Sequence, residues 1–142
     1  MIQVLALIAL AQVLPPVRGE LNPLVNQGNI SRTICYPRWT TRVRPPARYT
    51  SWLKTRQLLG FGILGFDSLY EEDHRVPLEL GGAPRDEDNL WPEPWFGKYN
   101  AHDKDRLENA VRRDVCVKRL TLEQGRAIFL GDFWKEYKRR FE

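Results

Sequence analysis

Three segments decide the fold of this chain: Glu71-Glu-Asp-His-Arg-Val-Pro-Leu-Glu-Leu-Gly-Gly82, Asp88-Asn-Leu-Trp-Pro92 and Asn100-Ala-His-Asp-Lys-Asp-Arg-Leu-Glu108. The first segment joins a histidine to an acidic neighbour and ends in a Gly-Gly turn. Its alternating apolar residues predict a strand over residues 73–80 with one buried face. The second segment predicts the returning strand over residues 89–91, and the third predicts a helix that begins at Asn100.

Further helices are predicted around this hairpin. Residues 49–59 are expected to be helical, and their predicted buried face consists of Trp52, Leu53, Arg56 and Leu59. Thr121 and Gln124 form a capping-box pattern that begins a helix ending near residue 129, and residues 132–140 predict a last helical segment. The 142 residues fit a single domain. The sequence therefore predicts a small α+β domain in which the hairpin is braced by helices.

Charge is distributed unevenly along the chain, whose formal net charge is +4. Residues 20–70 contain seven basic and two acidic residues, whereas residues 71–93 contain two basic and eight acidic ones. Residues 94–142 are again basic, with twelve basic and eight acidic residues. An acidic pocket between basic flanks suits a divalent cation beside a phosphate backbone, and an ordinary solvated acidic loop is the alternative.

The first 19 residues resemble a secretory signal peptide. Residues 1–14 are almost wholly apolar but too short to cross a bilayer as an ordinary helix, and Val17-Arg18-Gly19 is compatible with cleavage before Glu20. No Lys or Arg precedes the apolar run, which departs from the usual pattern. We expect a signal peptide over 1–19 and an exported domain over 20–142, periplasmic or secreted and without a transmembrane span. A buried element of the domain is the alternative for residues 1–14.

Cys35 and Cys116 are the two cysteines of the chain. An oxidising compartment would allow them to form a disulfide, closing a loop of about 80 residues and stabilising the fold by about 4 kcal/mol in the chain-entropy treatment. Their spacing does not fit a CxxC redox or zinc site. Two separate buried thiols are the alternative.

Asp73, His74 and Asn89 carry the groups that a phosphodiester hydrolase needs. Histidine titrates near neutrality and can remove a proton from water, and an aspartate oxygen can bind a hard cation. The Asn89 amide can hydrogen-bond the His74 ring and fix its tautomer. Because side chains alternate along a strand, a twist or a bulge is needed for Asp73 and His74 to serve one site.

The ordered motifs resemble the HNH, or His-Me finger, endonucleases, and they are closest to small exported bacterial proteins with an HNH-like core. The resemblance to the finger covers about 35 residues, and the wider one covers most of the chain after the predicted signal peptide. The matching motifs are Thr33 to Cys35, Arg44-Pro45, Glu72 to His74, Leu80 to Gly82, Asn89 to Pro92 and Asn100 to Asp105.

The resemblance implies a β-hairpin and a helix that hold one divalent cation, with Mg²⁺ favoured and Mn²⁺, Zn²⁺ or Ni²⁺ as alternatives. His74 would be the general base, Asn89 would orient it, and Asp73 would bind the metal. The helix would supply a second ligand, either Asn100 or His102. The residues expected to contact nucleic acid are Arg42, Arg44, Lys104 and Arg106, with DNA favoured over RNA.

The sequence therefore predicts a metal-dependent endonuclease of low sequence specificity. A catalytically silent nucleic-acid-binding or partner-binding module that retains the scaffold is a second possibility. A third is a protein that binds anionic surfaces through the basic segment Lys135 to Arg140.

Overall fold

The structure is a computed structural model that describes Leu14 and residues 16–142, so most of the predicted signal peptide lies outside the described residues. Its helices are α2 Trp39–Val43, α3 Ala47–Gly60, α4 Ala101–Cys116, α5 Leu122–Leu130 and α6 Phe133–Phe141. Its strands are β1 Tyr70–His74 and β2 Leu90–Pro94, and its 3-10 turns are η1 Gln27–Arg32, η2 Asp67–Leu69, η3 Leu78–Leu80 and η4 Glu87–Asn89. No helix among the described residues is both long enough and apolar enough to cross a membrane.

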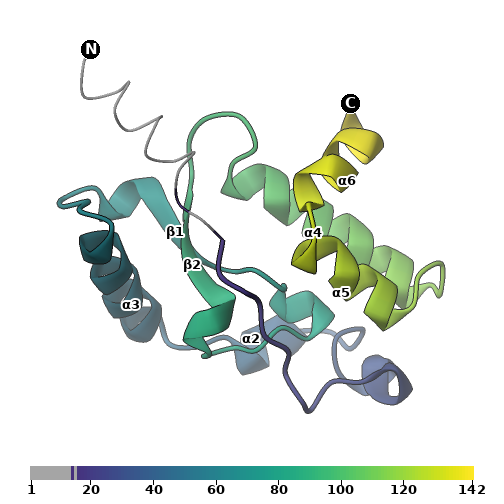
Figure 1. Cartoon of the computed structure of the whole chain (residues 1–142). Coiled ribbons are helices and arrows are strands. Elements are labelled where there is room, and N and C mark those ends of the chain that lie inside the picture. The colour runs from purple at the N-terminus through teal and green to yellow at the C-terminus, as the bar shows by residue number, and fades with distance from the viewer. Residues whose placement is uncertain (1–13, 15) are drawn as a thin grey trace.

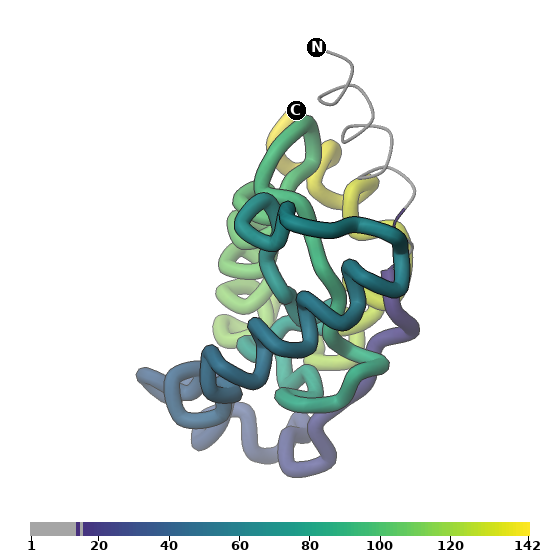
Figure 2. The backbone as a smooth tube through the Cα atoms, turned by 90° about the vertical axis from the view of Figure 1, so that its left-hand side faces the viewer, coloured from purple at the N-terminus to yellow at the C-terminus, as the bar shows by residue number. Residues whose placement is uncertain are grey.

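The hairpin of β1 and β2 lies at the centre of the molecule, with α3 on one side and α4, α5 and α6 on the other (Figure 1). The strands pair antiparallel, with His74 opposite Leu90 and Tyr70 opposite Pro94. In Figure 2 the molecule is seen from the side of α3, which crosses in front of the hairpin. The chain is thus one small mixed α+β domain, and a hairpin followed by a helix occurs as predicted.

The predicted strand over residues 73–80 is wrong in its extent, because β1 ends at His74. The N–H of Val76 is bound by the Asn89 side chain, and residues 78–80 form η3. Pro77 fixes its own backbone and has no N–H to continue a ladder. The apolar residues of the segment are nevertheless buried, with Val76 and Leu80 fully inaccessible. Alternation thus correctly indicated burial, but the buried segment is a compact turn and not a strand.

The predicted helices form, with one rotated face and one added helix. Asn100 caps α4, and the Thr121–Gln124 capping box begins α5 as predicted. In α3 the buried residues are Leu53 and Leu58, whereas Trp52 is 52% exposed and lies against Arg56. Packing against the hairpin buries Leu53 as predicted, but it buries Leu58 in place of the predicted Leu59. The short α2 lies in a segment from which no helix was predicted.

A disulfide links Cys35 to Cys116 across 81 residues and confirms the predicted pairing. It joins the segment after η1 to the last residue of α4. The main core beside it combines residues 25–34 with residues 80–137, and a second, smaller cluster contains Leu14, Leu58, Ile63 and Tyr70. The buried members of the main core are Val25, Ile30, Ile34, Leu80, Trp91, Leu107, Val111, Val115, Leu122, Phe129, Phe133 and Tyr137.

Residues 17–22 run along the loop between the two strands. The Val17 carbonyl accepts a hydrogen bond from Arg75 at 2.6 Å, and the Gly19 N–H donates to the Asp88 carbonyl at 2.7 Å. Leu21 forms a bridge with Gly82. The predicted cleavage before Glu20 falls inside this docked segment, and the signal peptide stays a prediction.

Candidate functional site

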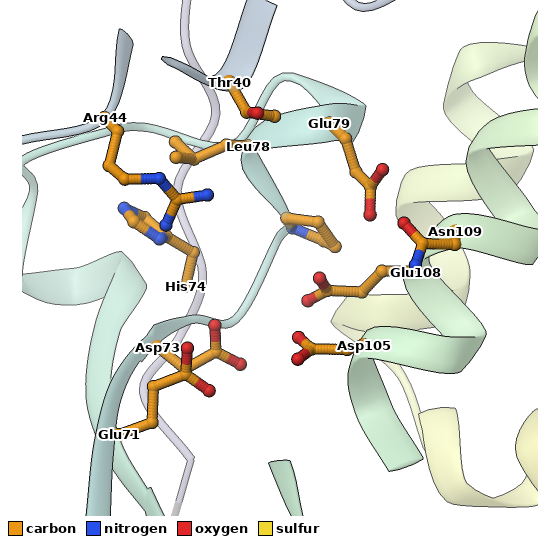
Figure 3. Close-up of a pocket in the computed structure, with 11 residues that line it drawn as sticks. Thr40, Arg44, Glu71, Asp73, His74, Leu78, Glu79, Asp105, Glu108 and Asn109 are labelled. Atoms are coloured by element: carbon orange, nitrogen blue, oxygen red, sulfur yellow. The ribbon is translucent and has the colours of Figure 1, made fainter. Parts of the chain in front are cut away.

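A cavity of about 300 Å³ lies between the end of β1, η3 and α4 (Figure 3). Acidic side chains from all three elements point into it. The lining residues are Thr40, Arg44, Glu71, Asp73, His74, Pro77, Leu78, Glu79, Asp105, Glu108 and Asn109. The two residues on which the sequence analysis depended, Asp73 and His74, are therefore brought to the same cavity. Because His74 is the last residue of β1, the chain turns there and strand alternation no longer separates the two side chains.

The His74 ring is held in one orientation by the backbone of the loop between the strands. Its Nε2 lies 2.9 Å from the Pro84 carbonyl oxygen. A carbonyl only accepts, so Nε2 carries the proton and Nδ1 keeps its lone pair. Nδ1 has no hydrogen-bond partner among the described residues and is not sealed from solvent. Burial lowers the pKa of His74, outweighing the Pro84 hydrogen bond and the charge of Asp73, both of which raise it. A neutral imidazole with a free Nδ1 has the form that a general base requires.

Asn89 does not contact the His74 ring, which corrects the predicted direct hydrogen bond. Its Oδ1 accepts from the Val76 and Glu20 N–H groups, and its Nδ2 donates to the Val76 and Ala83 carbonyls. These four bonds use the full capacity of the amide. Asn89 is fully buried, and one of its bonds holds the Ala83 carbonyl in place. The following carbonyl, that of Pro84, accepts the hydrogen bond from His74. Any orienting effect of Asn89 on the imidazole is therefore indirect.

Lys104 lies beneath the cavity, fully buried, and does not reach the surface as predicted for a phosphate contact. Its Nζ donates to Asp73 Oδ2 and to the His74 carbonyl, each at 2.8 Å, and also to Glu108. A lysine buried without partners would lose its proton, so these three acceptors keep it charged. Lys104 thus ties α4 to the end of β1.

The carboxylates around Lys104 outnumber its single positive charge. Burial alone would raise the pKa of Asp73, but the charge of the Lys104 ammonium and its hydrogen bond lower it to about 2. Glu93 and Glu108 are dominated by burial and by the Asp73 charge, and their pKa values are raised well above the usual range. One carboxylate is therefore ionised beside the ammonium while its neighbours retain protons. Additional positive charge bound at this cluster would favour ionisation of the carboxyl groups that now retain their protons.

The structure places neither predicted helix ligand at the cavity. Asn100 is the cap of α4, where its Oδ1 accepts from the His102 and Asp103 N–H groups. The His102 ring packs against Trp95 in a tilted arrangement, with 4.6 Å between ring centroids. The residues of α4 that do line the cavity are Asp105, Glu108 and Asn109. Their spacing of three and four residues places them on one helical face, and this signal was available in the sequence.

Of the predicted nucleic-acid contacts, only Arg44 lines the cavity as an exposed residue. Arg42 lies over the Tyr36 ring at 5.0 Å, and Arg106 lies over the Phe141 ring at 3.9 Å on the side of α6. The basic segment 135–140 is partly neutralised. Its Arg139 and Arg140 pair with Glu136, and Arg140 also pairs with Asp114.

The donor atoms at the cavity are carboxylate and amide oxygens, which suit a hard divalent cation such as Mg²⁺. Several buried carboxylate oxygens near the hairpin have no hydrogen-bond partner, namely Glu71 Oε2 and both oxygens of Glu72 and Glu93. Within the described part of the chain, no three His, Cys, Asp or Glu side chains converge as they stand on a common ion position. The oxygen donors therefore suit a metal ion chemically. In the present arrangement, the Lys104 ammonium supplies the positive charge beside the carboxylates.

No family model, curated protein or solved structure matches this chain. The resemblance to His-Me finger endonucleases therefore stays an expectation drawn from the sequence motifs.

Proposed function

We propose that this chain is a metal-dependent endonuclease that hydrolyses phosphodiester bonds with a His-Me finger. The observation that carries the proposal is the meeting of Asp73, an oriented neutral His74 and the α4 carboxylates at one cavity. The order of the parts, strand, loop, strand and helix, is that of the family the motifs resemble. The disulfide supports the further proposal that the protein works in an oxidising, extracytoplasmic compartment.

In the proposed mechanism His74 Nδ1 removes a proton from the attacking water, while Nε2–H stays on the Pro84 carbonyl. Arg44, exposed at the rim, holds a phosphate oxygen. Asp73 and the α4 residues Glu108 and Asn109 would bind the divalent cation. When bound, the cation would neutralise charge on the scissile phosphate and the leaving oxygen.

The charge of the segment before the hairpin supports a polyanionic substrate. Residues 21–66 contain seven basic residues and no acidic one. Of these residues, Thr40 in α2 and Arg44, which follows this helix, line the cavity. Nucleic acid bound through basic side chains is contacted mainly at its phosphates, which gives affinity that falls with salt and depends little on sequence.

The proposal is tested by incubating the purified, disulfide-bonded protein with labelled DNA and RNA, single-stranded and duplex, with Mg²⁺, Mn²⁺ or EDTA. Cleavage that requires the cation and stops in EDTA is the expected result. An absence of cleavage on all four substrates with either cation would overturn the enzymatic proposal.

The Lys104 ammonium favours a second candidate, a metal-free module that binds nucleic acid without cutting it. It lies 2.8 Å from Asp73 Oδ2 and supplies there a positive charge that a cation would otherwise supply. This candidate predicts nucleic-acid binding that is equal with and without EDTA, and no heat of binding on titration with Mg²⁺ or Mn²⁺.

The stability of the fold should depend on pH, and the effect of a divalent cation on stability should in turn change with pH. Burial, with the charges of neighbouring acidic residues, raises the pKa of Glu71 and of Glu72 to about 8 each. A carboxyl group whose pKa is raised in the folded state contributes to stability fully at pH values below its unfolded-state pKa. That contribution is lost as the pH rises through its folded-state pKa. The lowered pKa of His74 acts in the opposite sense but only below about pH 6.5. In EDTA we therefore expect the melting temperature to fall between about pH 6.5 and about pH 9.

The same melts in Mg²⁺ or Mn²⁺ test the metal. The cation should raise the melting temperature more at the higher pH, where more carboxylates are ionised. A melting temperature that rises with pH in EDTA would contradict the assigned protonation states. A cation effect that is absent at both pH values would contradict the metal site.

A further inference from the structure

We propose that Tyr49 is a positioning residue for His74, acting through the loop that carries the Pro84 carbonyl. This inference rests on the proposed role of His74 as the base. It concerns α3, from which the sequence motifs assign no residue to the site. Two side chains of α3 contact the loop: the Tyr49 hydroxyl donates to the Arg85 carbonyl at 2.8 Å, and Arg56 pairs with Glu87 further along.

Three consecutive carbonyls of this loop each accept a hydrogen bond from a different side chain. Asn89 Nδ2 donates to Ala83 at 3.0 Å, His74 Nε2 to Pro84 at 2.9 Å and Tyr49 to Arg85 at 2.8 Å. The carbonyl that holds the imidazole is therefore flanked on both sides by a carbonyl with its own side-chain donor. Anchoring both neighbouring peptide groups restricts the middle one, because a planar peptide group can turn only through the ψ angle of Pro84 and the φ angle of Arg85.

The two flanking contacts differ in how much else supports them. On the Ala83 side, the loop is also bound by the backbone, because the Ala83 N–H donates to the Glu20 carbonyl at 2.9 Å. On the other side, residues 85–88 are exposed. There Tyr49 supplies a hydrogen bond to the Arg85 carbonyl and a ring on which the Arg85 guanidinium lies at 4.6 Å. Tyr49 is thus the support nearest to Pro84 on this side, because the other contacts of the exposed half, Arg56 with Glu87 and the Gly19 N–H with the Asp88 carbonyl, lie two and three residues further along.

The anchor is rigid, because α3 is fixed to the hairpin by its own buried face. Leu53 and Leu58 are fully buried, and Gln57 donates to the Leu90 carbonyl at 2.9 Å. Tyr49 stands about one turn before Leu53 on the same helix. A bonded Pro84 carbonyl selects the tautomer with the proton on Nε2 and leaves Nδ1 free for the water. Loosening the loop would let the ring rotate or exchange tautomers, and small misplacements of a catalytic group cost much of its rate.

The test replaces Tyr49 by phenylalanine, which removes the hydroxyl and keeps the ring beneath Arg85. The matched control is Tyr36→Phe, because Tyr36 also lies against an arginine, Arg42 at 5.0 Å, and its hydroxyl has no hydrogen bond within the described residues. The first readout is the ¹⁵N spectrum of the histidine rings in EDTA, with His102→Ala used to assign His74. We expect a single Nε2–H tautomer in the parent protein and in Tyr36→Phe, and averaged ring-nitrogen shifts in Tyr49→Phe.

The second readout is steady-state cleavage. Tyr49→Phe should lower kcat about tenfold and leave KM within about twofold, while Tyr36→Phe leaves both unchanged. Ring-nitrogen shifts and kcat that are the same in Tyr49→Phe as in the control would overturn the inference. Because the spectrum is recorded without substrate, averaged shifts in a protein that cleaves nothing would sustain the positioning role and reject the endonuclease proposal.

Discussion

Replacing His74 by alanine is expected to lower the rate of cation-dependent phosphodiester cleavage by a factor of about 10²–10⁴, the range that a positioned general base contributes. The imidazole is the group at the cavity that combines a free lone pair with a fixed ring, through the Pro84 carbonyl at 2.9 Å. The measurement is kcat/KM on a labelled substrate in Mg²⁺ or Mn²⁺. The binding of the same substrate in EDTA should change little, because the ring acts on water and not on the phosphate.

The chain offers a matched control for this experiment in its second histidine. His102 is exposed, packs against Trp95 and does not line the cavity. His102→Ala should therefore cleave at nearly the parent rate. Equal rates for His74→Ala and the parent would exclude His74 as the base. A loss confined to His102→Ala would move the site to the start of α4.

Replacing Lys104 by methionine is expected to destabilise the protein by about 3–5 kcal/mol near neutral pH, the usual result of removing one partner from a buried ion pair. Methionine retains most of the volume beside Phe129 and Phe133, whose rings lie 5.5 and 5.9 Å from Nζ. The loss would come mainly from Asp73, whose buried, ionised carboxylate would be left without its ammonium, while Glu108 would lose its hydrogen-bond donor. Urea unfolding of the oxidised protein measures it.

Two comparisons isolate the buried charge. Lys98→Met changes an exposed lysine, 74% accessible, and should not measurably alter stability. The double variant Lys104→Met with Asp73→Asn removes the orphaned charge and should recover part of the loss. Without the ammonium, burial raises the Asp73 pKa, so the deficit of Lys104→Met should shrink as pH falls. A deficit that is independent of pH would indicate lost packing instead of unpaired carboxylates.

Local pattern was enough to predict those features of the fold that depend on neighbours in the sequence. The Asn100 cap and the Thr121–Gln124 capping box depend on residues two or three positions apart, and both occur as predicted. The strand prediction over 73–80 failed because alternation reports burial, and the turn after His74 buries Val76 and Leu80 without pairing them. Helix α3 was placed correctly and Leu53 is buried as predicted, but Leu58 is buried in place of the predicted Leu59, because the hairpin against which α3 packs is remote in sequence.

The candidate site was predicted in part for the same reason. Asp73 and His74 are adjacent, so the sequence alone placed them together, and their position at the end of a strand brings both to one cavity. The partner from α4 was misassigned to Asn100 or His102, because a motif gives spacing but not the rotation of a helix about its axis. That rotation follows from the burial of Leu107 and Val111, which turns Asp105, Glu108 and Asn109 toward the cavity.

The sequence by itself determined the helix caps, the adjacency of an acid and a histidine, the basic and acidic segments and the two cysteines available for a disulfide. Only the tertiary structure decided that Lys104 is a buried counter-ion, that Asn89 binds the loop instead of the ring, and that Pro84 holds His74. The reason is physical. Caps and charge runs are set by neighbouring residues, whereas a buried charge and a hydrogen-bonded ring depend on which distant segments exclude water from them.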